Sequence, residues 1–316
     1  MLFRSAFLTV VLLMFAINLP AKELKVLMIG NSFSICVGNY LPQIVQADQR
    51  NHLVLTSAYI GGCALNKHYD KLIEGEKSPK KKPPYKISVW DSASNAAWND
   101  AKVSYGYIND LIKNNQYDII TVQQASRMSF DYKTYEPYID ELIKYIRKYQ
   151  KNAEIVIQQT WAYREDFPGF GKWGFKQQGM YERICTAYRT LAEKYQLRII
   201  PMADAVQKFR ADTPVKYKRP DPEKKYKYPE LPSFAGDVVG LSLYQTNKKT
   251  KEKYMHNDYS HLNNQGNYLQ AACWYAFLFN EDAEKITFIP ESISPKEAEL
   301  LRKCAQEAVK NYKQIK

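Results

Sequence analysis

The chain alternates short, almost wholly apolar runs with longer amphipathic stretches, and this alternation constrains its fold more than any other feature. The apolar runs predict strands at about 24–29, 53–60, 118–124, 154–160 and 197–201. The amphipathic stretches predict helices at about 38–48, 64–74, 105–114, 134–149, 176–195 and 264–280. Apolar strands separated by helices form parallel sheets that are covered on both faces. The sequence therefore predicts an α/β fold, a doubly wound parallel five-stranded sheet sandwiched by helices, whose ligands bind beyond the carboxyl ends of the strands.

The first 21 of the 316 residues have the pattern of a secretory signal peptide. Arg4 precedes an apolar run, and Leu19-Pro20-Ala21 offers a cleavage site. We therefore expect a secreted or periplasmic protein in which residues 22–316 form a single domain.

Two segments rich in lysine and proline, at 74–86 and 211–234, interrupt the alternation, and we expect surface insertions around them, at 74–100 and 211–257. Proline removes hydrogen-bond donors from helices and central strands, so neither segment fits the core elements. The second insertion precedes a histidine-rich stretch. It is either a plain surface loop or a cover that brings Tyr and Lys to a sugar-like ligand.

Composition narrows the class of protein and of partner. With 45% hydrophobic and 25% charged residues, the chain has the composition of an ordinary globular protein, which excludes disordered and fibrous classes. The net charge of +12 favours polyanions, but the lysines are scattered and no nucleic-acid-binding motif accompanies them. We expect no nucleic-acid partner, and no stable membrane anchor because no later segment approaches about 20 consecutive apolar residues. Five cysteines are too few for a disulfide scaffold.

The first predicted strand runs directly into a small polar cluster, in the sequence VLMIGNSFS at 26–34. A serine on a tight turn between a strand and a helix stands at the carboxyl edge of the sheet, with its hydroxyl exposed and backbone N–H groups close by. That position suits nucleophilic catalysis. Gly30 permits the turn and Ser32 is the candidate nucleophile, although Ser and Asn are also common helix caps.

The stretch HNDYSHLNNQGNY at 256–268, which begins at the end of the second insertion, holds two of the four histidines. Asp258 and His261 lie three residues apart in a predicted loop that opens the last core helix. A carboxylate there can hold the imidazole in the tautomer that accepts a serine proton, and can stabilise the imidazolium that forms. His256 is an alternative base or a substrate contact. We expect His52 and His68 to be structural or exposed.

Four blocks of sequence, taken in order, resemble the SGNH, or GDSL-like, hydrolases and more closely a poorly characterised bacterial branch of them. The blocks are IGNSFS at 29–34, IGGCALNKHY at 60–69, YDIITVQQAS at 117–126 and DYSHLNNQGNYLQAACWY at 258–275. The aspartate–x–x–histidine pair is the most specific element. The resemblance implies one flavodoxin-like, three-layer SGNH domain and a serine esterase that needs no cofactor and no metal. Ser32 would attack an ester carbonyl, His261 would act as general base and then acid, and Asp258 would orient it.

The same resemblance implies an oxyanion hole, which stabilises the negative charge that forms on the ester oxygen. The backbone N–H groups of Ser32 and Gly62 would be two of its donors. Most members place an asparagine after the central strand as the third donor, but here the strand ends in VQQASRM. Gln124 is the expected donor by its closer match to the block. Gln123 is the alternate or a supporting partner, because neighbours on a strand point to opposite faces.

Aromatic residues near the same sheet edge are candidates for substrate binding. Trp161 and Tyr163 follow the fourth predicted strand, and Tyr59 lies at the end of the second. An indole in that place either packs in the core or stacks on a sugar ring, and stacking is the preferred hypothesis.

Together these features predict a secreted serine ester hydrolase that forms an acyl-enzyme, with a carbohydrate acetyl esterase as the preferred activity. Its partner would be a small-molecule or polysaccharide ester, since an exported chain without an apolar lipid-binding segment suits a polar substrate. A thioesterase or lipase-like esterase is the alternative enzyme. A non-catalytic polysaccharide-binding protein of the same fold is the alternative outside catalysis. Clustered Cys and His, which would argue for a metal, are missing from the sequence.

Overall fold

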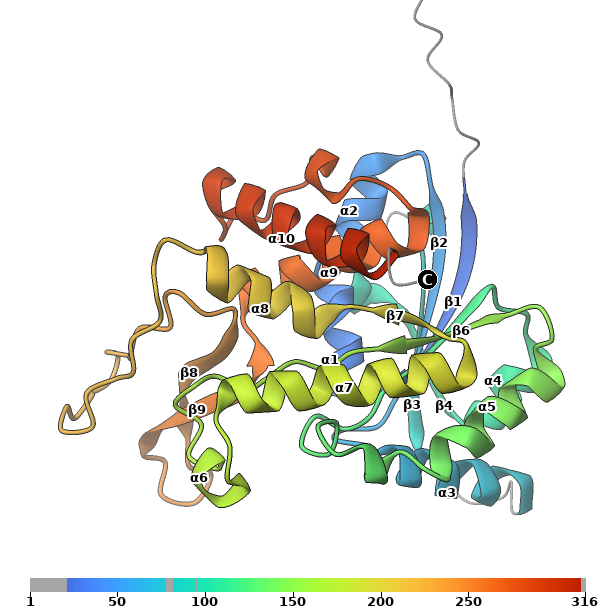
Figure 1. The fold of residues 1–316 in the computed structure, drawn as a ribbon, viewed down its shortest axis with the longest axis horizontal. Coiled ribbons are helices and arrows are strands. Elements are labelled where there is room, and N and C mark those ends of the chain that lie inside the picture. The colour runs from blue at the N-terminus through green and yellow to red at the C-terminus, as the bar shows by residue number, and fades with distance from the viewer. Residues whose placement is uncertain (1–21, 78–81, 95, 314–316) are drawn as a thin grey trace, which may run out of the picture.

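The computed structural model describes residues 22–77, 82–94 and 96–313 (Figure 1). Residues 1–21, where the sequence predicts a signal peptide, lie outside these ranges. Among the helices within them, none is both long and apolar enough to cross a membrane.

Within the described residues, seven strands form one sheet in the order β4-β3-β2-β1-β5-β6-β7 (Figure 1). Its parallel strands are β1 (Glu23–Gly30), β2 (His52–Tyr59), β5 (Ile119–Val122), β6 (Glu154–Gln158) and β7 (Arg198–Ile200). An antiparallel pair, β3 (Tyr85–Asp91) and β4 (Lys102–Gly106), extends one edge. The predicted doubly wound α/β fold is confirmed, and the sheet has two strands more than expected.

The antiparallel pair lies partly within 74–100, the first predicted insertion. β3 pairs with β2, for example Trp90 with Leu55, and most of its side chains are buried. The strand directly follows the lysine- and proline-rich run, which hid it from the periodicity. β4 is an exposed edge strand with Lys, Ser and Tyr side chains, and such strands carry little apolar signal.

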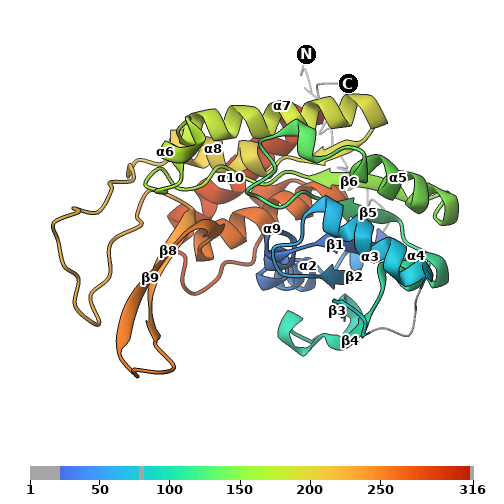
Figure 2. The same cartoon turned by 90° about the horizontal axis from the view of Figure 1, so that it is seen from below.

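Helices cover both faces of the sheet (Figures 1 and 2). One face carries α3 (Leu65–Lys77), α4 (Ile108–Asn114), α5 (Tyr138–Tyr149) and α7 (Gln177–Tyr195). The other carries α2 (Leu41–Asp48), α8 (Met202–Asp212), α9 (Asn264–Phe279) and α10 (Pro295–Lys313). The short helices are α1 (Ser32–Ile35) and α6 (Phe170–Trp173). Right-handed crossovers produce this division, because the order of the strands reverses direction at β1. That reversal is where ligands bind in such sheets.

A second, two-stranded antiparallel sheet projects from the body of the molecule (Figure 2). It consists of β8 (Val239–Thr246) and β9 (Lys253–Leu262), and most of it lies within 211–257, the second predicted insertion. β9 runs directly into α9, whose N-cap, Asn263, accepts a hydrogen bond from Gly266 N–H. Asp258 and His261 therefore lie near the end of a strand, where the sequence predicted a loop. The hydrogen bonds of the hairpin hold this pair in place.

Candidate active site

The turn after β1 presents Ser32 at the carboxyl edge of the sheet. Asn31 caps α1, since its side-chain oxygen accepts the N–H of Phe33 at 3.0 Å. A Cβ atom at Gly30 would lie 2.4 Å from Ser34 Oγ and 3.0 Å from Ser34 Cβ, so a larger residue there would displace Ser34. The turn that the sequence predicted is therefore enforced by contacts within it.

Two buried side-chain amides hold α1 in place. The side chains of Gln158 on β6 and Gln270 on α9 both donate to the Phe33 carbonyl, at 2.8 and 2.9 Å. They satisfy an acceptor that the short helix leaves without a helical partner. The nucleophile is thus tied to the sheet and to the central helix of one layer.

The structure brings Ser32, His261 and Asp258 together in one chain of hydrogen bonds. His261 Nε2 lies 2.7 Å from Ser32 Oγ, and His261 Nδ1 lies 2.6 Å from Asp258 Oδ2. Both distances are those of strong hydrogen bonds. With Nδ1–H donating to the carboxylate, Nε2 is left to accept the serine proton.

Asp258 is built to remain ionised. Burial opposes its ionisation, but hydrogen bonds from the His261 ring and from the backbone N–H groups of His261 and Ser260 outweigh burial and hold the pKa of Asp258 well below its usual range. The Ser260 hydroxyl also donates to it, at 3.1 Å. A fixed negative charge at this position stabilises the imidazolium that forms when His261 takes a proton.

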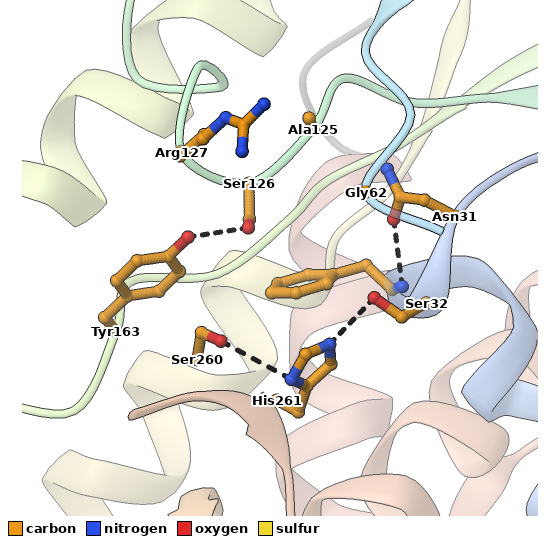
Figure 3. A pocket seen from close by; sticks show the side chains of 10 residues that line it. Asn31, Ser32, Gly62, Ala125, Ser126, Arg127, Tyr163, Ser260 and His261 are labelled. Carbon is orange, nitrogen blue, oxygen red and sulfur yellow. Dashed lines mark hydrogen bonds between the residues drawn. The ribbon is translucent and has the colours of Figure 1, made fainter. Parts of the chain in front are cut away.

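A pocket of about 140 Å³ opens over Ser32 (Figure 3). It lies among the segments that follow β1, β2, β5 and β6 and the end of β9. Its lining consists of Asn31, Ser32, Phe33, Gly62, Ala125, Ser126, Arg127, Tyr163, Ser260 and His261. The pocket therefore forms where the carboxyl ends of the parallel strands meet.

Both expected backbone donors of an oxyanion hole belong to residues that line this pocket. Gly62 has a φ of +58°, a conformation that disfavours other residues, and lies in the turn after β2. Asn31 Nδ2 donates to the carbonyl of Cys63 at 2.9 Å, which ties this turn to the turn of Ser32. The two N–H groups are thus held on one rigid unit.

The expectation that Gln124 supplies the third donor does not fit the geometry. Its amide nitrogen donates to the carbonyl and hydroxyl of Thr134, at 2.9 and 3.1 Å, and its oxygen accepts from the N–H groups of Leu65 and Ala125. Fully buried and fully bonded, Gln124 holds the loop after β5 in place. Gln123, the alternate, does not line the pocket either and donates to Asn31 Oδ1 at 2.7 Å.

The predicted aromatic platform is wrong for Trp161. This residue has no exposed surface, stacks on Phe33 with ring centroids 4.3 Å apart, and donates to the Ser260 carbonyl at 2.8 Å. Trp161 therefore packs beneath the pocket as a core residue. Tyr163 does line the pocket, with its hydroxyl 2.7 Å from Ser126 Oγ. Tyr59 is half-buried and does not line it.

Ser126, Arg127 and Ser260 line the pocket and were not singled out from the sequence. The first two follow the central strand in VQQASRM, so the rule that sites lie beyond strand ends could have found them. The histidines outside the triad lie elsewhere. His68 is fully buried and bonded to Tyr85. Within the described residues, no group of three His, Cys, Asp or Glu could hold a metal ion.

A serine after the first strand, a parallel strand order of β2-β1-β5-β6-β7, and an Asp-x-x-His pair before α9 define an SGNH-like fold. The chain belongs to the DUF4886 family, described as a domain of unknown function, whose family model matches residues 25–218. The crystal structure of a DUF4886 family protein from Bacteroides uniformis ATCC 8492 is similar. It shares 26% sequence identity, with 91% of this chain and 95% of that chain covered and a TM-score of 0.70.

More distant matches include proteins that are named as a hydrolase or an esterase. A protein from Slackia heliotrinireducens, proposed to be an SGNH hydrolase, is 19% identical over 60% of this chain and 84% of its own, with a TM-score of 0.41. Axe2, an acetylxylan esterase from Geobacillus stearothermophilus, is 13% identical over 58% and 78%, with a TM-score of 0.35. No curated protein matches the chain significantly.

Proposed function

We propose that this protein is a serine ester hydrolase that removes small acyl groups such as acetyl from carbohydrate. The observation that carries the proposal is the chain of hydrogen bonds from Asp258 through His261 to Ser32, at the edge of a pocket. A helix-capping serine has no need of a histidine on its hydroxyl or of a buried carboxylate behind that histidine. This arrangement is the one that activates a serine hydroxyl.

The first half-reaction forms the acyl-enzyme. Ser32 Oγ bonds to the ester carbonyl carbon while its proton passes to His261 Nε2. The carbonyl oxygen becomes an oxyanion that the N–H groups of Ser32 and Gly62 stabilise. When the carbonyl re-forms, the bond to the alcohol oxygen breaks and His261 gives that oxygen the proton.

The second half-reaction releases the acid. His261 takes a proton from water while the water oxygen bonds to the acyl carbon. It then returns the proton to Ser32 Oγ as the bond between Oγ and the acyl carbon breaks. Asp258 stays ionised throughout and holds the ring in one orientation. Serine, histidine and aspartate are regenerated, so the net reaction is ester plus water to acid plus alcohol.

The size of the pocket supports a small acyl group. Its volume of about 140 Å³ is below the roughly 300–1,000 Å³ that is usual for pockets holding drug-sized ligands. An acetyl group fits such a space, whereas a long acyl chain does not. A polar substrate outside the cytoplasm also suits the signal peptide that the sequence predicts, so the proposal includes export.

Hydrolysis of 4-nitrophenyl esters of increasing acyl length tests the proposal. We expect the protein to turn over the acetate faster than the octanoate and to gain one fluorophosphonate adduct by intact mass. Ser32→Ala should lose both. Ser104→Ala, on the exposed edge strand β4, is the matched control and should keep both. A folded protein that hydrolyses no ester and forms no adduct on Ser32 would contradict the proposal and favour a sugar-binding role.

A further inference from the structure

Arg127 is an unpaired cation in the lining of the catalytic pocket. It lies in the loop after β5, and Figure 3 places it with Ser126 across the pocket from Ser32 and His261. The side chain is exposed, and it forms no hydrogen bond or ion pair with any residue that the structure describes. Its charge reaches the pocket: burial raises the pKa of Tyr163, and Arg127 opposes that rise. A guanidinium in this position can bind an anionic group of a substrate that is bound at Ser32.

Two basic segments project from the same end of the molecule, and we call residues 213–235 and 246–254 the basic arms (Figures 1 and 2). Together they hold ten Lys and Arg against four Asp and Glu, a net charge of +6 out of +12 for the whole chain. The arms touch, since Tyr228 packs edge-on against Tyr244 and Lys253 lies 4.6 Å from the Tyr228 ring centroid. Half of the excess positive charge is therefore concentrated on one tenth of the chain.

A cleft of about 500 Å³ lies where the first basic arm meets β9. The arm contributes Arg219, Lys224 and Tyr226, and β9 contributes Asn257 and Tyr259. Tyr259 directly precedes Ser260, which lines the catalytic pocket, so β9 contributes residues to both the cleft and the pocket.

The cations of the cleft differ from Arg127 in their partners. Each of them pairs with a carboxylate: Arg164 with Asp166 at 2.7 Å, Arg219 with Glu165 at 3.2 Å, and Lys224 with Glu230. Arg127 is therefore more available to a ligand than the cations that line the cleft. The cleft adds aromatic faces and a positive field, which attract an extended polyanion without a dedicated pocket for each charge.

We propose that the substrate is an ester of an acidic glycan, in which a uronate carboxylate beside the scissile ester binds Arg127 and the following sugars occupy the cleft under the basic arms. This inference rests on the proposed function of Ser32. An arginine pairs with a carboxylate through two parallel hydrogen bonds, which fixes the orientation of the sugar as well as its charge. Tyr226 and Tyr259 line the cleft, and tyrosine side chains suit sugars because both are partly apolar and partly polar.

The test compares acetate release from acetylated polygalacturonate and from acetylated xylan that carries no uronate, matched in acetyl content. We expect kcat/KM to favour the acidic polymer at least tenfold, and the preference to shrink as salt is added. Arg127→Gln should lower the ratio of the two kcat/KM values about tenfold. Lys151→Gln removes a positive charge from the turn before β6, at the opposite edge of the sheet, and should leave the ratio unchanged.

The cleft has its own measurement. Replacing Arg219 and Lys224 together by Gln should raise KM for the acidic polymer several-fold while leaving KM for an acetylated galacturonic acid monomer the same. Thermal unfolding of each variant establishes that it is folded before it is assayed. If Arg219 and Lys224 only supported the structure, their replacement would change KM for the polymer and KM for the monomer to the same extent.

Equal kcat/KM on the two polymers, or a ratio that Arg127→Gln does not change, would overturn the inference. So would tight, salt-sensitive binding of single-stranded DNA by the basic arms with no preference in turnover, since it would assign them to another polyanion. Hydrolysis of 4-nitrophenyl acetate distinguishes failure of the acidic-substrate inference from failure of the esterase proposal. If it persists while the preference is absent, only the acidic substrate is wrong. If it is absent with no adduct on Ser32, the esterase proposal itself fails.

Discussion

The side-chain amide of Gln123 donates to Asn31 Oδ1 over 2.7 Å, and this bond joins β5 to the turn that carries Ser32. Asn31 in turn donates to the Cys63 carbonyl, so one short chain of amides fixes the Ser32 and Gly62 turns relative to each other. Such buried links between turns determine whether a site is held at its reactive geometry.

Gln123→Met should lower kcat for 4-nitrophenyl acetate about tenfold with little change in KM, because the two turns lose their common anchor while the pocket keeps its lining. A loss of about 1.4 kcal/mol corresponds to this factor and is comparable to one buried hydrogen bond. Steady-state kinetics at a temperature where the variant is folded provides the measurement. Gln124→Met is the matched comparison and should mainly reduce the melting temperature. The opposite pattern, with kcat lost only in Gln124→Met, would restore Gln124 as an oxyanion donor.

Asp258→Asn should reduce kcat by about 10³–10⁴, as in other serine hydrolases that lose this carboxylate. An amide can donate to His261 Nδ1, which favours the tautomer in which Nε2 carries a proton and cannot accept one from Ser32. Because the pKa of Asp258 is held low, the carboxylate is ionised at all ordinary assay pH values, so raising the pH should not restore the variant. Asp282→Asn, at a remote helix cap, is the control. A loss of less than tenfold in a folded Asp258→Asn protein would remove this residue from the triad.

The core of the fold and the residues of the candidate triad could be predicted from the sequence because both rest on local signals. Apolar runs mark the five parallel strands, since residues buried on both faces have no polar alternation. The hairpin β8–β9 was missed because most of its side chains are half-buried or exposed and it adjoins a segment rich in Lys and Tyr, so its strands lack the continuous apolar runs of the main sheet. Placing His261 needed only its spacing from Asp258, and that spacing is the same in a loop and in a strand.

The roles of the side chains around the triad could not be read from the sequence because they depend on which contacts are already made. Gln123 and Gln124 are equivalent as letters. They differ in their hydrogen-bond partners: Gln123 bonds to Asn31, 92 residues away in the sequence, and Gln124 bonds to Thr134, 10 residues away. Trp161 follows a strand end whether it binds sugar or packs in the core. Only its stacking against Phe33 in the structure identifies it as a core residue.

Gly62→Ala should give a folded protein that is less stable by about 1 kcal/mol and hydrolyses esters more slowly. The left-handed φ of +58° is unfavourable for alanine, although no atom lies within 4 Å of the added Cβ. Relief of this strain would move the N–H that is expected to stabilise the oxyanion, so kcat should fall more than KM changes. Urea unfolding and ester kinetics measure the two effects. An unchanged kcat together with the loss of stability would exclude this N–H from the oxyanion hole.

His68 should make the protein sensitive to mild acid. Burial lowers the pKa of His68 from 6.5 to about 4, and the ring is fully buried with Nδ1 at 2.8 Å from the Tyr85 hydroxyl. Between these two pH values the unfolded chain binds a proton that the folded protein does not, so stability falls as the pH is lowered from about 6.5 towards 4. Linkage puts the loss at roughly 2 kcal/mol between pH 7 and pH 5.

His68→Phe removes the titrating group, so its free energy of unfolding should change less over the same interval, whatever its value at pH 7. Urea unfolding at several pH values measures this difference in slope. His52→Phe, which removes a partly exposed histidine at the start of β2, is the comparison. If the native protein and His68→Phe lose stability equally as the pH falls, then His68 is already protonated in the folded state or is not buried in solution.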